Sequence, residues 1–188
     1  AKPDSRFHWN FAEFIADYQG SDKGAELIRD LKVYKKAQVI FITPDNNMEK
    51  LREFAIKDKK ILLTTTYGIN RGFQVTYPGD VPEGKEELAT TLDGLEKFMK
   101  PISLKEIKEK LRKVDMLVTG ASAITPSGIR FGKGHGYFDL EWAMLWEIQA
   151  VNPQTPVIAV GHDCQVVDID IETTPYDTIV DYCELMDI

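Results

Sequence analysis

Cysteine and histidine are scarce in this chain, which has two cysteines and three histidines among 188 residues. Two cysteines do not make a disulfide framework, and no metal-ligand spacing joins them to the histidines, which argues against a zinc site. We therefore expect Cys164 and Cys183 to be reduced thiols in a cytoplasmic protein. A Cys164–His162 nucleophile pair is disfavoured, because Cys164 lies in an apolar, strand-like run without a neighbour that would activate its thiol.

Long apolar runs, a signal-peptide pattern and an excess of basic residues are also absent. No segment approaches the roughly 20 apolar residues that a membrane-spanning helix needs. Lys and Arg number 23 against 30 Asp and Glu, a formal net charge of −7. An acidic chain is poorly suited to non-specific nucleic-acid binding, which depends on neutralising phosphates. We expect a small-molecule ligand, with neither nucleic acid nor membrane as a partner; the sequence indicates no oligomeric state.

Apolar strand-like runs alternate with helical patterns along the chain. Strands are expected at Ala37–Ile42, Lys60–Thr65, Phe73–Tyr77 (at a sheet edge), Asp115–Thr119, Ile129–Phe131, Val157–Val160, Val166–Ile169 and Thr178–Val180. Helices are expected at Asn10–Tyr18, Ala25–Leu31 with Ser21 as N-cap, Met48–Lys57, Glu86–Met99, Ser103–Lys113 with a Ser103/Glu106 capping box, and Tyr137–Ala150. This order predicts one three-layer α/β domain over residues 1–188, its mostly parallel sheet covered by helices on both faces. Residues 79–102 are the only candidate insertion.

The loop before the last predicted helix alternates glycines with charged side chains; residues 128–141 read GIRFGKGHGYFDLE. Glycines let backbone N–H groups converge on one point, and the helix N-terminus behind them adds further donors. Arg130 and Lys133 supply positive charge, and Asp139 and Glu141 supply carboxylates that suit Mg²⁺. The loop follows the predicted strand Asp115–Thr119, at the edge where parallel α/β sheets bind ligands. It predicts a phosphate ester bound with a metal, although a glycine-rich turn can also be a plain tight connection.

A second polar cluster follows the strand predicted at Val157–Val160. His162 and Asp163 come directly after it, and polar residues at this place are functional more often than elsewhere. The alternative is that His162 satisfies a buried backbone carbonyl and that Asp163 caps a turn. Asp177 is a weaker candidate of the same kind.

Taken together, these motifs resemble the 5-formyltetrahydrofolate cyclo-ligase family, also called methenyltetrahydrofolate synthetase. Gly128–Asp139 resembles the family's glycine-rich ATP loop, and Val114–Gly120 resembles the strand before it. Further similar segments are Leu51-Arg52 with Ala55 and Lys59-Lys60, His162–Asp168, Tyr176-Asp177 with Asp181, and Arg6 with Asn10-Phe11. The resemblance covers most of the chain.

The resemblance implies a fold like that of ribose-phosphate isomerase and CoA-transferase domains, with ATP as co-substrate and Mg²⁺ as cofactor. ATP would phosphorylate the formyl oxygen of 5-formyltetrahydrofolate; attack by N10 would then give 5,10-methenyltetrahydrofolate and release phosphate. The candidate residues are Arg130, Lys133 and Asp139 for catalysis; Gly132, Lys133, Gly134, His135, Gly136 and Tyr137 for the nucleotide; Trp9, Arg52, Tyr67, His162 and Asp163 for the substrate; and Asp139 with Glu141 for the metal.

The chain departs from the family pattern after Asp139. The usual loop continues with Arg where this chain has Leu140, followed by Glu141, a pattern that resembles the divergent methenyltetrahydrofolate synthetase domain proteins. The family's opening basic helix is not recognisable in the first residues, where Lys2 and Arg6 only partly replace it. Three hypotheses follow: a folate cyclo-ligase, a related enzyme with another small substrate, or a non-catalytic nucleotide- or folate-binding domain.

Overall fold

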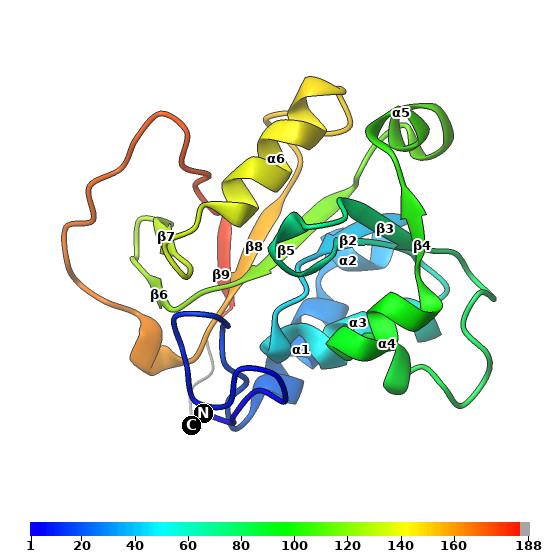
Figure 1. Cartoon of the computed structure of the whole chain (residues 1–188). Helices are drawn as coiled ribbons and strands as arrows, with labels where there is room; N and C mark the ends of the chain where they lie inside the picture. Colours follow the sequence, from blue (N-terminus) through cyan, green and yellow to red (C-terminus); the bar gives the residue numbers. More distant parts are fainter. Residues whose placement is uncertain (185–188) are drawn as a thin grey trace.

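A seven-stranded, mostly parallel sheet forms the centre of the computed structural model, which describes residues 1–184 and their side chains through Asp181 (Figure 1). The strands lie in the order β4 (Lys100–Ile102), β3 (Phe73–Thr76), β2 (Ile61–Thr65), β1 (Val39–Ile42), β5 (Met116–Gly120), β8 (Val157–Val160) and β9 (Tyr182–Glu184). Strands β2, β1, β5, β8 and β9 pair in parallel, each with the next in this order. Strand β3 pairs antiparallel with both β2 and β4. The predicted α/β class is therefore confirmed.

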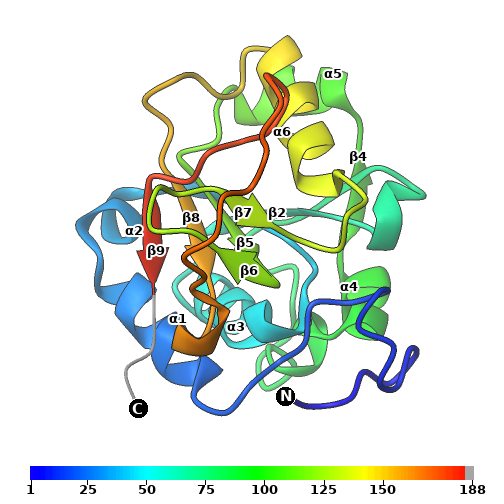
Figure 2. The same ribbon diagram turned by 90° about the vertical axis from the view of Figure 1, so that its left-hand side faces the viewer.

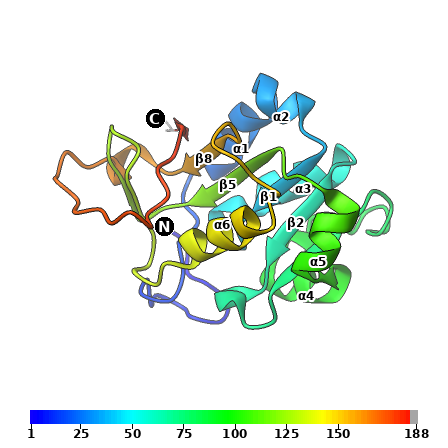
Figure 3. The ribbon, with the colours of Figure 1, turned by 90° about the horizontal axis from the view of Figure 1, so that it is seen from above.

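Helices cover both faces of this sheet and give it three layers. One face packs against α1 (Ser21–Asp30), α2 (Lys32–Lys36), α3 (Glu49–Lys57) and α4 (Leu92–Phe98); the other packs against α5 (Leu104–Glu106), the π-helical turn Ile107–Leu111 and α6 (Tyr137–Glu147). Strand β1 is buried on both sides, because Val39 and Phe41 enter one core while Ile40 and Ile42 enter the other. Figure 3 shows α6 lying over the sheet. The ring centres of Phe138 on α6 and Phe41 on β1 are 6.5 Å apart.

A small ribbon of β6 (Ala123–Ile124) and β7 (Arg130–Phe131) follows the carboxyl end of β5 and lies in front of β5 and β8 in Figure 2. The long segment that follows the 3-10 turn Asp163–Gln165 lies beside it, because Val167 donates its N–H to Ile124 and Val180 donates to Gly128. The remaining 3-10 turns are Asn46–Met48, Tyr67–Ile69 and Leu88–Thr90. No helix within residues 1–184 has the length and apolar character needed to cross a bilayer.

Three predicted elements are wrong because tertiary contacts override local preference. Residues 11–13 form turns and residues 14–18 have no regular structure, although this segment buries Phe14, Ile15 and Tyr18 at positions that would share one face of a helix. Residues 166–169 and 178–180 are irregular, and the last strand begins at Tyr182. Cys164 accordingly lies in the exposed turn Asp163–Gln165 and not in a strand; the side chain of Cys183 is outside the described part.

Other predicted elements differ in their limits. The helix expected at residues 86–99 divides at Thr91, whose hydroxyl caps α4 by accepting from the Gly94 N–H. Gly20, and not Ser21, precedes α1, and β4 takes the edge position expected for β3. The Ser103/Glu106 capping box is present as predicted.

The fully buried Arg52 side chain joins the turn after β1 to the segment before α4. Its guanidinium donates to the carbonyl oxygens of Thr43 (2.6 Å), Asp45 (2.9 Å) and Thr90 (2.8 and 3.1 Å). Burial lowers the pKa of Arg52 to about 10, so the group remains charged at neutral pH. Arg52 from α3 thus connects three backbone carbonyls, of which only that of Asp45 also accepts from a backbone N–H, that of Met48 at 3.1 Å.

We expect Arg52→Leu to lower the free energy of unfolding by about 3 kcal/mol or more, because the buried carbonyl oxygens of Thr43 and Thr90 lose the donors that Arg52 supplies. Urea unfolding followed by tryptophan fluorescence measures this change. The matched control is Arg71→Leu, since Arg71 is largely exposed and forms only a surface ion pair with Glu96. Equal unfolding midpoints for the two variants would contradict a structural role for Arg52.

Candidate functional site

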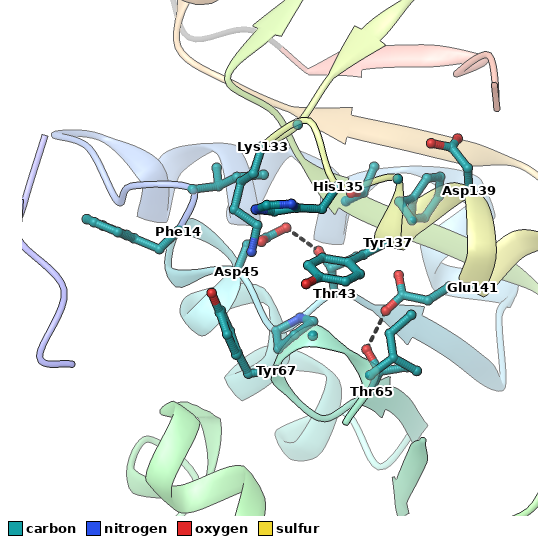
Figure 4. Close-up of a pocket in the computed structure, with 18 of the residues that line it drawn as sticks. Phe14, Thr43, Asp45, Thr65, Tyr67, Lys133, His135, Tyr137, Asp139 and Glu141 are labelled. Carbon is teal, nitrogen blue, oxygen red and sulfur yellow. Dashed lines mark hydrogen bonds between the residues drawn. The ribbon is translucent and has the colours of Figure 1, made fainter. Parts of the chain in front are cut away.

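A cavity of about 320 Å³ lies where the carboxyl ends of the central strands meet the glycine-rich loop and the start of α6 (Figure 4). The strand ends and the turns after them contribute polar side chains, the loop contributes its backbone and charges, and the N-terminal segment closes one wall. The strand ends and turns contribute Thr43, Asp45, Thr65, Tyr67 and Thr119, and the loop with α6 contributes Arg130 to Asp139 and Glu141. The N-terminal segment contributes Phe14 and Ile15, and the segment after the turn Asp163–Gln165 contributes Asp177. This is the edge of the sheet at which the sequence placed a ligand.

The glycine-rich loop presents unused backbone donors to the cavity. Gly134 and Gly136 have φ values of +77° and +67°, which side chains with a Cβ rarely adopt. No described residue accepts a hydrogen bond from the N–H groups of residues 132–136. Helix α6 begins directly behind them without a side-chain cap. Free N–H groups followed by a helix N-terminus form a place for an anion.

Lys133 is held between two aromatic rings at the rim of the cavity. Its Nζ lies 4.7 Å from the ring centre of Tyr67 and 5.3 Å from that of Tyr137, and it donates to the Glu13 carbonyl oxygen at 3.1 Å. The Tyr67 hydroxyl donates to Glu13 as well; burial, together with this bond, raises the pKa of Tyr67. The predicted residues Lys133, Tyr67 and Tyr137 therefore meet in one cluster.

Arg130 brings a second positive charge to the same cavity. Its guanidinium lies 4.9 Å from the ring centre of Phe138 and donates from Nη1 to the Gly120 carbonyl at 3.2 Å. Nε is buried and has no hydrogen-bond partner among the described residues. Burial lowers the pKa of Arg130, while the carboxylates of Asp139 and Asp45 oppose this shift. An arginine with unused donors beside a cavity suits an anionic ligand.

Glu141 is an acid placed in a core position of α6. The buried stripe of this helix is Phe138, Glu141 and Leu145. Glu141 is 2% exposed and accepts a hydrogen bond from Thr65 at the end of β2. Burial raises the pKa of Glu141 to about 8, and the nearby Asp45 adds to the effect. The carboxyl group is therefore largely protonated at neutral pH.

The Asp139–Glu141 pair does not fit the predicted metal site. Residues two apart on a helix do not face each other, and Glu141 is buried and largely protonated. Asp139 accepts from the Thr178 N–H at 2.8 Å through one oxygen, which leaves the other available. No group of three or more metal-ligating side chains occurs in residues 1–184. Glu141 thus loses its predicted role as a ligand, and for Asp139 that role stays a prediction.

Four predicted substrate residues lie outside the cavity lining. Arg52 is buried among backbone carbonyls, and Trp9 is 60% exposed against Phe11. His162 caps the turn Asp163–Gln165 by accepting from the Cys164 N–H at 3.2 Å, so it satisfies a backbone N–H and not a backbone carbonyl. Asp163 begins that turn. None of the four residues lines this cavity, and a substrate contact for them stays a prediction.

The sequence analysis missed several residues of the cavity wall. Thr43 and Asp45 follow β1, Thr65 ends β2 and Thr119 lies near the end of β5, all polar residues at the end of an apolar strand. Their position relative to the strands was a usable signal. Phe14 gave no such signal, because only the path of the N-terminal segment brings it to the cavity.

Comparison with known proteins gives one consistent family. The model of the 5-formyltetrahydrofolate cyclo-ligase family matches residues 13–183. Two curated relatives are methenyltetrahydrofolate synthase domain-containing proteins, from Homo sapiens at 35% identity and from Bos taurus at 34%, each over 89% of this chain. The chain spans about 44% of the length of these relatives.

Solved structures with the same fold are more distant in sequence. A 5,10-methenyltetrahydrofolate synthetase from Mycoplasma pneumoniae superposes with a TM-score of 0.53 at 12% identity, covering 87% of this chain and 83% of that one. The enzyme of the same name from Aquifex aeolicus gives 0.54 at 18% identity, covering 88% and 77%. At such identities the likeness concerns the fold alone.

We expect Glu141→Gln to change how stability depends on pH. Because the pKa of Glu141 is about 8 in the folded chain against an ordinary 4.5, the folded state holds a proton that the unfolded state releases between these values. The contribution of Glu141 to stability is thus complete below pH 4.5 and is lost as pH rises to about 8. Between pH 4.5 and about 8, the free energy of unfolding of the variant should rise by roughly 2–5 kcal/mol relative to that of the parent.

Urea unfolding at a series of pH values between 4 and 9 measures this difference. Glu147→Gln is the matched control, since Glu147 lies on the same helix and is exposed; its difference from the parent should not change with pH. A constant difference for Glu141→Gln as well would mean that Glu141 is ionised in the folded chain.

Proposed function

Because the chain belongs to the 5-formyltetrahydrofolate cyclo-ligase family, we propose that its cavity binds ATP and a reduced folate and converts 5-formyltetrahydrofolate to 5,10-methenyltetrahydrofolate. The observation that carries the proposal is the set of unused N–H groups at residues 132–136, with Lys133 and Arg130 beside them. This arrangement suits the phosphates of a nucleotide. A cytoplasmic location remains a prediction.

The proposed reaction requires charge neutralisation on the transferred phosphoryl group more than it requires a strong base. Backbone N–H groups of the loop, Lys133 and Arg130 would stabilise that group as the formyl oxygen attacks the terminal phosphorus and ADP leaves. The N10 amine of the folate would then attack the activated formyl carbon and close the ring, and loss of phosphate and of the N10 proton would give the methenyl product. Tyr67, Tyr137 and Phe14 offer aromatic walls for a flat ring.

The departure from the family loop at Leu140 is compatible with this function. Leu140 is 51% exposed and is not part of the cavity lining. The side chain of an arginine at position 140 would extend from the exposed side of α6. The substitution therefore does not remove a charge from the cavity wall. The second hypothesis, another small substrate, draws its support from the buried acid Glu141.

We expect this chain to form the methenyl product from Mg²⁺-ATP and 5-formyltetrahydrofolate. The near-ultraviolet absorbance of the product measures this turnover.

Lys133→Ala should weaken ATP binding about tenfold or more, because a charge beside the phosphate-binding N–H groups is removed. Its free energy of unfolding should fall by only about 1 kcal/mol, the worth of the contact with the two rings.

Lys105→Ala is the control, since Lys105 is 82% exposed on another helix. It should leave turnover and ATP affinity unchanged. Turnover that is absent from the parent while ATP still binds would favour another substrate. Loss of both activities in the parent would favour a binding domain without catalysis or a site that has decayed.

A further inference from the structure

Residues 3–16 form a strap along one wall of the cavity. The strap begins and ends at one place, because the Lys2 N–H donates to the Asp17 carbonyl oxygen at 2.8 Å and the two side chains form an ion pair. Between these ends it consists of turns and irregular backbone. Phe14 and Ile15 lie in the strap and line the cavity. A segment held by local turns opens more easily than the sheet and helices around it.

The start of the strap is anchored away from the glycine-rich loop. Asp4 accepts from the Asn46 side-chain amide at 2.7 Å, and Arg6 forms ion pairs with Asp93 and Glu96 on α4. These contacts join the strap to the turn after β1 and to α4. They do not hold its later part, around Glu13, to the loop that binds the ligand.

One hydrogen bond among the described residues joins the glycine-rich loop to the strap. Lys133 Nζ donates to the Glu13 carbonyl oxygen at 3.1 Å, and the Tyr67 hydroxyl donates to the same oxygen at 2.8 Å. The Lys133 side chain reaches from the loop toward Tyr67, with its ammonium 4.7 Å from the ring centre (Figure 4). Lys133, Glu13 and Tyr67 form a latch between the loop and the strap.

An anion on the loop would compete with Glu13 for Lys133. The free N–H groups of residues 132–136 place such an anion beside this lysine. An ammonium group attracts a charged phosphate oxygen more strongly than the oxygen of a neutral carbonyl. Binding of a phosphate group therefore draws Lys133 away from Glu13, which keeps only Tyr67 as a donor.

The turn that carries Tyr67 is strained. Ile69, two residues further on, has a φ of +57°, which is a genuine outlier for a β-branched residue. Ile69 also lines the cavity. Strain of this kind persists only while the surrounding contacts maintain it, and it is concentrated at ligand clamps and switch regions. Loss of a latch contact thus acts on a turn that is already under strain.

The cavity has to enlarge to hold two ligands. Its volume of about 320 Å³ lies at the low end of the roughly 300–1,000 Å³ that is typical of a site for one small molecule. A nucleotide and a second substrate together need more space. The strap provides the cavity wall that the least regular structure supports.

We propose that the latch holds the strap against the cavity in the ligand-free chain, and that the phosphates of a bound nucleotide release it by drawing Lys133 away from Glu13. The wall formed by Phe14 and Ile15 then moves outward, and the second ligand enters after the nucleotide. This regulation rests on the anion-binding part of the proposed function. Because such coupling is reciprocal, a latch that the nucleotide opens must also weaken nucleotide binding.

Cleavage by a glutamyl endopeptidase after Glu13 measures the release, because the carbonyl group of the cleaved bond is the one that Lys133 and Tyr67 hold. ATP, at a concentration that calorimetry shows to be saturating, should speed this cleavage at least about threefold. Inorganic tripolyphosphate should act in the same way, and adenosine should not. Cleavage after Glu83, in the exposed segment between β3 and the turn Leu88–Thr90, is the internal control and should keep its rate.

Unchanged cleavage after Glu13 with ATP bound would overturn the proposal, and so would equal acceleration by adenosine. A chain that binds neither ATP nor tripolyphosphate would overturn the proposed function and this inference together. Acceleration by ATP in a chain without folate turnover would support the latch and overturn the proposed function alone.

Lys133→Ala removes the latch without any ligand. Cleavage after Glu13 should then be about threefold to tenfold faster than in the ligand-free parent, and saturating ATP should change it little further. Lys105→Ala, an exposed lysine far from the strap in sequence, is the matched control and should behave like the parent. Equal cleavage rates for ligand-free Lys133→Ala and the parent would contradict the latch.

Tyr67→Phe tests the reciprocal effect, because it keeps the ring beneath Lys133 and removes only the hydroxyl that holds Glu13. We expect faster cleavage after Glu13 together with ATP binding that is about twofold to fivefold tighter, since Lys133 is released at a lower cost. A hydroxyl that only stabilises the fold, or that contacts the nucleotide, would leave ATP affinity unchanged or weaken it. Either result would overturn the proposal. Circular dichroism confirms that each variant is folded.

Discussion

The buried guanidinium of Arg52 is the interaction on which the architecture of the cavity depends. It gathers the carbonyl oxygens of Thr43, Asp45 and Thr90 from two segments that are far apart in the sequence. Arg52 fixes the backbone of the turn after β1. The Asp45 side chain in this turn accepts from the Gly120 N–H at 3.1 Å and from the Thr43 hydroxyl at 2.6 Å. The ends of β1 and β5 are thereby joined, and one wall of the cavity is set.

Donors and acceptors both line the cavity. Uncapped N–H groups and Lys133 lie in the glycine-rich loop, whereas the buried Arg130 lies among the acidic side chains Asp45, Asp139 and Glu141. Glu13, from the N-terminal segment, engages both Lys133 and Tyr67, so this segment is part of the wall although it has no regular structure.

The chain keeps the fold of enzymes with which it shares 12% and 18% sequence identity, although its cavity differs from the family pattern. Apolar strands and amphipathic helices tolerate extensive substitution as long as volume and pattern are kept. Residues that touch a ligand are under a different constraint, because each donor or acceptor has to meet a partner. Leu140 and Glu141 are adjacent, yet one faces outward and the other lines the cavity. Of the two, only Glu141 lies where a ligand in the cavity could reach it.

The sequence by itself determined the α/β class, the mostly parallel sheet, the glycine-rich loop at the ligand edge and the Ser103/Glu106 capping box, because each depends on contacts between residues close in the chain or on a regular period. It did not determine the roles of Arg52, His162 and Glu141. Arg52 meets Thr90 across 38 residues and Glu141 meets Thr65 across 76, so only the tertiary structure decides which partner each charge finds. Burial, which separates a structural arginine from a ligand-binding one, arises only when these distant segments pack together.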